Sequence, residues 1–141
     1  MEQCVVKIVA SRPDAATYNC GTGCFVAKNY VLTAAHVIPL DCVSLWIYHD
    51  RTITPAKQCF RDNTLDICII SPTKAVKHDC ITMNKTIRQG QQCYSIGFAT
   101  DNNATTCKVG AVLAMNETSA ERFDYLATSI VVELGMSGAP I

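Results

Sequence analysis

Gly21-Thr-Gly-Cys-Phe-Val-Ala-Lys-Asn-Tyr-Val-Leu-Thr-Ala-Ala-His36-Val37 is the stretch of this sequence that decides the fold. Strand-forming residues flank Lys28-Asn29, where asparagine favours a tight turn, so the stretch predicts two short strands joined as a hairpin. The second strand ends in Thr33-Ala-Ala-His36, whose small residues let the histidine lie tightly against a neighbouring surface. A single histidine is more often structural than catalytic, so its meaning depends on the residues that follow it.

The composition is that of a folded chain without an unusual charge. The 141 residues are 49% hydrophobic and 17% charged, which is enough to bury the core of one ordinary domain or of two small barrels. The 12 basic residues balance the 12 acidic ones, and no basic run gives electrostatic support for binding nucleic acid or a membrane surface. No apolar stretch is long enough to span a bilayer, and the N-terminus lacks the pattern of a signal peptide.

Cysteine is heavily used, and its odd number excludes complete internal pairing. The nine residues are Cys4, Cys20, Cys24, Cys42, Cys59, Cys68, Cys80, Cys93 and Cys107. Many lie inside strand-like runs, where cysteine behaves as a small buried hydrophobe. Reduced thiols and an intracellular or polyprotein setting follow as the expectation. A zinc site at Cys20, Cys24 and another pair is the alternative, which the absence of any CxxC pair weakens.

Short strand-like runs follow one another between glycine and proline residues, and no segment indicates a long helix. The first set is Val5–Val9, Gly23–Ala27, Tyr30–Thr33, Val43–Tyr48, Ile53–Phe60 and Leu65–Ile70. Pro55 predicts an edge position for the fifth run. A polar segment, Thr73–Gly90, is read as a connector with one short strand near Ile81. The second set is Gln92–Phe98, Cys107–Met115 and Phe123–Ile130.

This pattern predicts an all-β protein built from two sequential barrels or sandwiches. The first, residues 1–75, carries His36 and Asp66. A connector, residues 76–90, leads to the second, residues 91–141, which carries Ser137 in a glycine-bounded loop. The junction between two such units is a common place for a cleft.

Three residues supply the parts of a nucleophilic site. Asp66 opens an apolar strand, where an unpaired buried carboxylate would be costly. Ser137 lies between Gly135 and Gly138, which permit a tight turn that presents the hydroxyl and aims successive N–H groups at one point. Each motif alone has an ordinary structural reading. Together with His36 they provide a hydroxyl, a base and a group that orients the base, in the order His, Asp, Ser.

These motifs resemble those of trypsin-like and chymotrypsin-like serine proteases, and look most similar to HtrA-type and viral polyprotein proteases. The matching segments are Thr33–His36, Gly21–Gly23 with Phe25-Val26, Leu65–Ile70, Ser95–Phe98 with Val109-Gly110, and Gly135–Pro140. They occur in the family's order and cover nearly the whole chain. The resemblance implies a chymotrypsin-like double β-barrel and a serine endopeptidase that acts on polypeptides without a metal or cofactor.

Residue roles carry over by position in these motifs. The resemblance makes Ser137 the nucleophile, His36 the general base and Asp66 the group that orients it. The backbone N–H groups of Gly135 and Ser137 would hold the oxyanion. The residue about six before the serine often forms the base of the specificity pocket, which here is Val131 and implies an uncharged pocket.

Some positions depart from the family pattern. Met136 and Ala139 replace the usual residues around Ser137, although neither side chain is catalytic. Family members continue with roughly two more strands beyond the serine, whereas this sequence ends at Ile141, so we expect a piece of a longer protein with an incomplete second barrel. Open strand edges then predict self-association.

Two alternatives remain beside the protease reading. One is a truncated or non-catalytic trypsin-like domain that binds peptides or protein partners. The other is an unrelated all-β binding protein in which the motifs arise by chance. His49 and His78 have no partner motif and are predicted to be surface residues.

Overall fold

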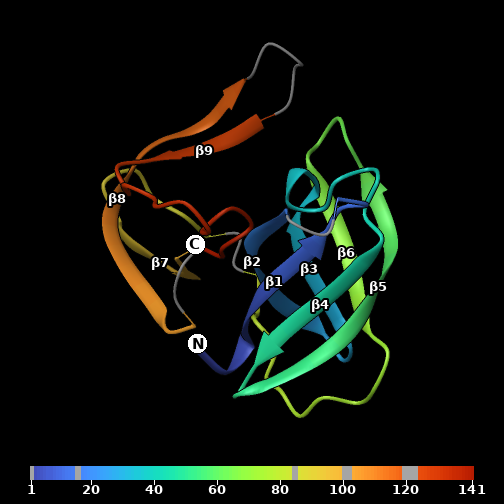
Figure 1. Cartoon of the computed structure of the whole chain (residues 1–141). Coiled ribbons are helices and arrows are strands. Elements are labelled where there is room, and N and C mark those ends of the chain that lie inside the picture. The colour runs from blue at the N-terminus through green and yellow to red at the C-terminus, as the bar shows by residue number, and fades with distance from the viewer. Residues whose placement is uncertain (1, 15–16, 84–85, 100–102, 119–123) are drawn as a thin grey trace.

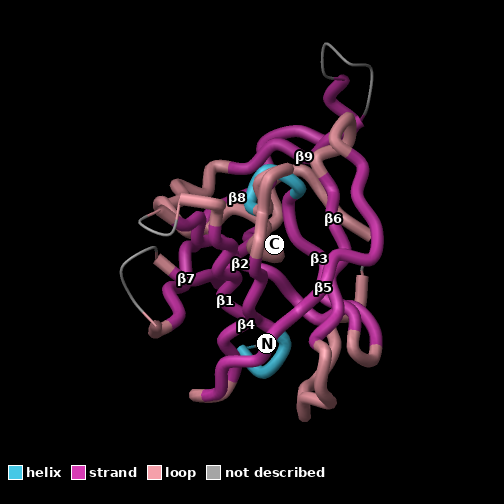
Figure 2. Tube along the Cα trace, turned by 45° about the vertical axis from the view of Figure 1, so that its right-hand side comes forward, coloured by secondary structure: helices cyan, strands magenta, loops and turns pink. Residues whose placement is uncertain are grey.

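The structure, a computed structural model, describes residues 2–14, 17–83, 86–99, 103–118 and 124–141. In these ranges strands dominate, and the two helices are single 3₁₀ turns, η1 (Glu2–Cys4) and η2 (Ala35–Val37) (Figure 2). The all-β prediction is therefore confirmed. None of the helices in the described ranges has the length and apolar character needed to cross a membrane.

Six antiparallel strands close into a barrel in the order β1-β2-β3-β6-β5-β4 (Figure 1). They are β1 (Val5–Ser11), β2 (Tyr18–Ala27), β3 (Tyr30–Ala34), β4 (Ser44–His49), β5 (Thr52–Asp62) and β6 (Ile67–Pro72). Each overlaps one of the six predicted runs. The Lys28-Asn29 turn between β2 and β3 is also confirmed, with Asn29 at a φ of 62°, a conformation that asparagine adopts more readily than most residues.

The barrel is filled by the alternate side chains that its strands send inward. In β6, Cys68 and Ile70 are buried, whereas Ile67 and Ile69 on the other face are half-buried. Eight apolar residues of the core have no exposed surface: Val6, Ile8, Ala10, Phe25, Val31, Ile47, Cys68 and Ile70. Burying one of the valine, isoleucine or phenylalanine side chains contributes about 1.5–3 kcal/mol, so this core holds rigidly the strand ends that carry the motifs.

The predicted edge position of Pro55 is wrong. β5 lies between β4 and β6 in the closed barrel, and Pro55 is the residue at which it changes neighbours. Residues 52–55 pair with β4, ending at Trp46↔Pro55, and pairing with β6 begins at Ala56↔Pro72. A missing N–H is accommodated at such a corner as well as at an edge.

The connector lies against the barrel instead of forming the predicted strand near Ile81. Within the described residues 73–83 no strand forms, and Ile81 N–H donates a hydrogen bond to Phe25 O at 2.8 Å. The His78 ring stacks on the Phe25 ring with centroids 3.5 Å apart, and its Nε2 accepts the Asn29 N–H at 3.1 Å. His49 is only 5% exposed. The surface prediction is therefore wrong for His49, which is buried against Phe25, whereas His78 is half-buried, with its ring stacked on Phe25.

The second unit is a three-stranded antiparallel sheet in the order β7-β8-β9. Its strands are β7 (Gln92–Phe98), β8 (Thr105–Thr118) and β9 (Asp124–Thr128). Phe123, the predicted start of the last strand, lies outside the described residues. A small cluster of Val5, Ile96 and Phe98 joins this sheet to the barrel, and the C-terminal segment lies between the two units (Figure 1). One closed barrel beside an incomplete second one confirms the predicted fold class, and the domain boundaries at residues 75 and 90 stay a prediction.

Candidate active site

Asp66 makes three hydrogen bonds to the turn that carries His36, two of them to His36 itself and one to Ala35. β3 ends at Ala34, and the η2 turn that follows carries His36, with Ala35 buried beneath it. Ala35 N–H donates to Asp66 O at 3.0 Å, and His36 N–H donates to Asp66 Oδ1 at 2.8 Å. The second carboxylate oxygen, Oδ2, lies 2.7 Å from His36 Nδ1. The backbone and the side chain of the aspartate thus fix the position of the imidazole.

The turn before β6 presents the carboxylate in this position. Asp62 Oδ1 accepts the N–H groups of Thr64 and Leu65, each at 3.0 Å, which closes the turn. Asp66 itself has a φ of 57°, in the left-handed region that aspartate tolerates better than most residues. The sequence predicted a strand starting at Leu65, but β6 starts at Ile67, so Asp66 belongs to the turn.

The pairing determines which nitrogen of His36 carries a proton. A carboxylate can only accept hydrogen bonds, so the short contact requires the proton to be on Nδ1. Nε2 then keeps its lone pair and is the nitrogen that can act as a base. Both side chains remain about half exposed, at 59% for His36 and 48% for Asp66, so this face of the pair is open to a substrate.

The loop that carries Ser137 lies against the strands that lead to His36. Gly135 and Gly138 both have positive φ values, 96° and 86°, and between them Met136 is buried while Ser137 is exposed. Thr22 N–H donates to Ser137 O at 2.8 Å. This places the serine loop beside β2 at the end of the barrel.

Gly138 shows how closely the loop approaches His36. A Cβ atom added to Gly138 would lie 2.2 Å from Thr22 O, 2.4 Å from Thr33 Oγ1 and 3.0 Å from the backbone nitrogen of Ala34, two residues before His36. The structure therefore brings the loop of Ser137 next to the segment that holds His36 and Asp66. The hydrogen bonds that His36 makes to described residues all run to Asp66, so the imidazole is not bonded to Ser137 here.

Two backbone amides of the loop are unengaged. Met136 N–H donates to Glu133 O at 3.1 Å, and Ala139 N–H donates to Met136 O at 2.9 Å. Among the described residues, the N–H groups of Gly135 and Ser137 have no such acceptor. Two such amides, one of the serine itself and one two residues before it, are the kind of donors that a developing oxyanion requires.

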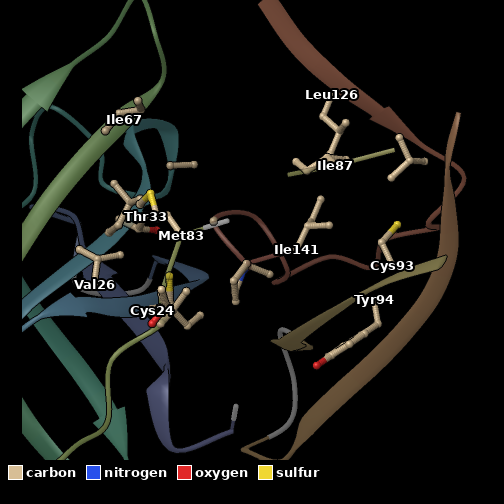
Figure 3. Close-up of a pocket in the computed structure, with 18 of the residues that line it drawn as sticks. Cys24, Val26, Thr33, Ile67, Met83, Ile87, Cys93, Tyr94, Leu126 and Ile141 are labelled. Atoms are coloured by element: carbon tan, nitrogen blue, oxygen red, sulfur yellow. The ribbon is translucent and has the colours of Figure 1, made fainter. Parts of the chain in front are cut away.

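A cavity of about 670 Å³ lies beside these residues, between the barrel and the second sheet. Cys24, Val26 and Ile67 line it from the barrel, and Cys93, Tyr94 and Leu126 from the sheet, with Ile141 between them (Figure 3). Asp66 and Gly138 also border it. Its size suits a ligand segment, and its walls are mostly apolar. Val131 is 77% exposed and does not line this cavity, so its role in a pocket stays a prediction.

All nine cysteines are free thiols. Burial, and to a smaller extent the nearby Cys4, together raise the pKa of the Cys24 thiol to about 11, so this thiol is protonated at neutral pH. Among the described residues, no group of three or more His, Cys, Asp or Glu side chains is placed to hold a metal ion. The zinc alternative gains no support from Cys20 and Cys24.

Sequence comparison assigns the family. The trypsin-like peptidase domain matches residues 21–141 of this chain. The chain belongs to the trypsin-like peptidase family. The matched region of this family member contains His36, Asp66 and Ser137. Comparison of the sequence with curated proteins gave no match.

Solved structures share the fold of this trypsin-like peptidase domain. The Rv3671c protease from M. tuberculosis in its active form matches with a TM-score of 0.85 and 21% identity, over 99% of this chain and 64% of that chain. The HtrA-type protease AlgW with a tripeptide gives 0.85 and 18%, over 98% and 46%. The serine endoprotease from Yersinia pestis gives 0.79 and 24%, over 98% and 48%. The chain thus spans about half to two thirds of the length of these proteins.

Sequence reasoning missed one residue of the site. Thr22 was read only as part of the matching Gly21–Gly23 segment, whereas its buried side chain contacts the serine loop and the second sheet. The available signal was a hydroxyl between two glycines in an otherwise apolar strand. That signal does not reveal the partners, because they lie more than 70 residues away in sequence.

Proposed function

We propose that this chain is the catalytic part of a serine endopeptidase that hydrolyses peptide bonds through an acyl-enzyme. The observation that carries the proposal is the two-oxygen attachment of His36 to Asp66, beside a glycine-bounded loop that exposes Ser137. A base fixed in its reactive tautomer next to an exposed hydroxyl is the arrangement that nucleophilic acyl transfer requires.

In the first half of the reaction, Ser137 Oγ attacks the carbonyl carbon of the scissile peptide bond, and His36 Nε2 takes the hydroxyl proton. Asp66 keeps accepting from Nδ1 and stabilises the imidazolium that forms. The N–H groups of Gly135 and Ser137 donate to the negative oxygen of the tetrahedral intermediate. Collapse of this intermediate breaks the C–N bond, and His36 gives its proton to the leaving amine.

In the second half, a water molecule replaces the amine. His36 Nε2 takes a proton from this water as its oxygen attacks the ester carbonyl of the acyl-enzyme. The same two amides stabilise the second tetrahedral intermediate. Its collapse breaks the bond to Ser137 Oγ, which regains the proton from His36, and the product leaves as a carboxylic acid that releases its own proton to the solvent. Atoms and protons balance over the two halves with water as the only co-reactant.

The substrate in this proposal is a polypeptide. The apolar cavity bordered by Asp66 and Gly138 supports a preference for uncharged side chains near the scissile bond. Val131, which the family resemblance predicts at the base of the specificity pocket, has an uncharged side chain and agrees with this preference. The formal net charge of the chain is +0, so electrostatic attraction gives no support for a nucleic-acid or membrane partner.

A second candidate is a non-catalytic relative that binds peptides. It is favoured by one observation, the lack of a hydrogen bond between His36 and Ser137 in this structure. Such bonds are often long in unliganded sites and form with the substrate, so the catalytic proposal is preferred.

Self-association is the other partner prediction, since Tyr94, Val109 and Leu113 leave apolar surface exposed on the second sheet. Sedimentation that shows only monomers at high concentration would contradict it.

Peptide cleavage tests the proposed function. The purified chain and its Ser137→Ala variant are each incubated with a mixture of unstructured peptides, and new N-termini are identified by mass spectrometry. The proposal predicts cleavage by the parent chain that disappears in the variant, and the flanking residues report the specificity. Binding of peptides without cleavage, equal in both proteins, would favour the non-catalytic relative.

A further inference from the structure

Thr22 lies at the junction of four parts of the molecule. It sits in β2 with no exposed surface. Its N–H donates to Ser137 O at 2.8 Å, and its carbonyl oxygen accepts the hydroxyl proton of Thr33 in β3 at 2.7 Å. Its hydroxyl oxygen lies 3.0 Å from Phe98 N in β7 and 2.8 Å from Gly135 O. One residue therefore bonds to the histidine strand, the second sheet and the serine loop.

The direction of these hydrogen bonds is fixed by counting protons. A threonine hydroxyl has one proton to donate and lone pairs that accept. The backbone N–H of Phe98 can only donate, so it points into a lone pair of Thr22 Oγ1. Gly135 O can only accept, so the hydroxyl proton must go to it. The bonds run in one direction, from the second sheet through Thr22 to the serine loop.

These contacts immobilise the peptide groups around the two free amides. The peptide group between Gly135 and Met136 is held at both ends, because Thr22 donates to its oxygen and its N–H donates to Glu133. The peptide group after Ser137 is held through its oxygen, which accepts the Thr22 N–H. The N–H groups of Gly135 and Ser137 adjoin these held groups and so have little freedom to turn.

The hydroxyl and the carbonyl oxygen of Thr22 are both closely surrounded by neighbouring strands and by the serine loop. A Cβ atom added to Gly97 of β7 would lie 3.1 Å from Thr22 Oγ1, and one added to Gly138 would lie 2.2 Å from Thr22 O. In Thr22→Val a methyl group fills the place of the hydroxyl, so water has no room there to take over the two hydrogen bonds. Both Phe98 N–H and Gly135 O would lose a buried partner.

We propose that Thr22 is a positioning residue of this site, which holds the Gly135 and Ser137 amides in place for the oxyanion through its hydroxyl bond to Gly135 O. The inference rests on the proposed function, since it concerns the same reaction. Thr22 touches neither the nucleophile's hydroxyl nor the base, and it acts through the loop. Preorganised donors of this kind account for a large share of the rate of acyl transfer.

Two substitutions separate the hydroxyl from the shape of the side chain. Thr22→Val keeps the volume and the N–H bond to Ser137 but removes the hydroxyl. Thr22→Ser keeps the hydroxyl and removes only a methyl group. Thr54→Val is the matched control, because Thr54 is a buried threonine of the barrel, 6% exposed, in β5. If the valine variant does not fold, Thr22→Ala replaces it, since a smaller side chain introduces no overlap.

The measurement is the rate at which a fluorophosphonate labels Ser137, separated into the limiting rate and the half-saturating concentration. The phosphorus oxygen of this reagent develops negative charge as an acyl oxygen does. We expect Thr22→Val to lower the limiting rate by about 10- to 100-fold with an unchanged half-saturating concentration. Thr22→Ser should stay within about threefold of the parent chain, and Thr54→Val should not change the rate. Amide NMR signals of Gly135 and Ser137 should shift in the valine variant only.

The outcomes distinguish a failure of the role of Thr22 from a failure of the proposed function. A folded Thr22→Val that is labelled at the parental rate, with unshifted Gly135 and Ser137 amides, overturns the role of Thr22 and leaves the proposed function intact. Equal losses in Thr22→Val and Thr22→Ser also overturn it, because the hydroxyl would then not be the cause. A folded parent chain that is never labelled at Ser137 refutes the proposed function, and the positioning role falls with it.

Discussion

Replacing Gly138 by alanine tests the close approach of the serine loop to the barrel. A Cβ atom at this position would lie 2.2 Å from Thr22 O and 2.4 Å from Thr33 Oγ1, and the residue has a φ of 86°. Gly90 offers a matched control. Its φ is 83°, but a Cβ atom there would meet nothing within 4 Å. Both substitutions carry the same backbone strain, and only one adds a steric overlap.

The size of the effect follows from these two terms. The left-handed conformation costs an alanine about 1–2 kcal/mol, and the lower entropy of the unfolded alanine chain offsets about 0.5–1 kcal/mol of that. Gly90→Ala should therefore lower the free energy of unfolding by about 1 kcal/mol. Gly138→Ala adds an overlap with buried backbone and a buried hydroxyl, worth about 1–3 kcal/mol more. The loop can relieve the overlap only by moving away from β2 and β3.

Urea unfolding measures the loss of stability, and the rate of fluorophosphonate labelling measures the displacement of Ser137. Gly138→Ala should be less stable than Gly90→Ala by about 1–3 kcal/mol, and it should lose most of its labelling because Ser137 moves with the loop. Gly90→Ala should be labelled at the parental rate. If the two variants had the same stability and both were labelled normally, the loop would not contact the barrel as the structure has it.

Three further predictions concern other parts of the molecule. In Asp66→Asn the side chain cannot accept hydrogen bonds from both the backbone N–H and the ring Nδ1–H of His36, so the rate of labelling should fall about 10³-fold or more. The free energy of unfolding should fall by less than about 1 kcal/mol because the pair is half exposed. Asp41→Asn, the same change at a surface ion pair, should alter neither quantity. His78→Ala should lower the unfolding free energy by about 1–3 kcal/mol, and His78→Phe by less, because phenylalanine retains the ring contact with Phe25; equal losses would show that stacking does not matter. Burial raises the pKa of Cys24 from 9.0 to about 11, so the folded state prefers the protonated thiol; the resulting stabilisation is complete below pH 9.0 and is lost as the pH rises through about 11. Urea midpoints between about pH 8 and about pH 10.5 should therefore fall more in the parent chain than in Cys24→Ala, and parallel declines would contradict this.

Much of the fold could be predicted because local patterns determine it. β-branched and aromatic residues in short runs identify the strands, and the Lys28-Asn29 turn joins β2 to β3 as expected. Closure of the barrel is not a local property. Pro55 indicated an edge by its missing N–H, yet it occupies a corner of a closed barrel, a context that only the pairing of distant strands creates.

The site was predictable in part for the same reason. His36, Asp66 and Ser137 stand in motifs whose residue types and order indicate their chemistry, and the pairing of His36 with Asp66 places the first two together. Thr22 and His78 make their contacts across 113 and 49 residues of sequence. A lone threonine in a strand and a lone histidine in a polar segment carry no local sign of such partners.

The most direct test of the catalytic claim is to find where a fluorophosphonate attaches to the folded chain. Intact mass followed by peptide mapping gives the number and position of the adducts. We expect one adduct, on Ser137, which disappears in Ser137→Ala. An adduct on another residue, labelling that persists in Ser137→Ala, or a folded chain that takes up no reagent would contradict the claim that this site is an assembled serine peptidase centre.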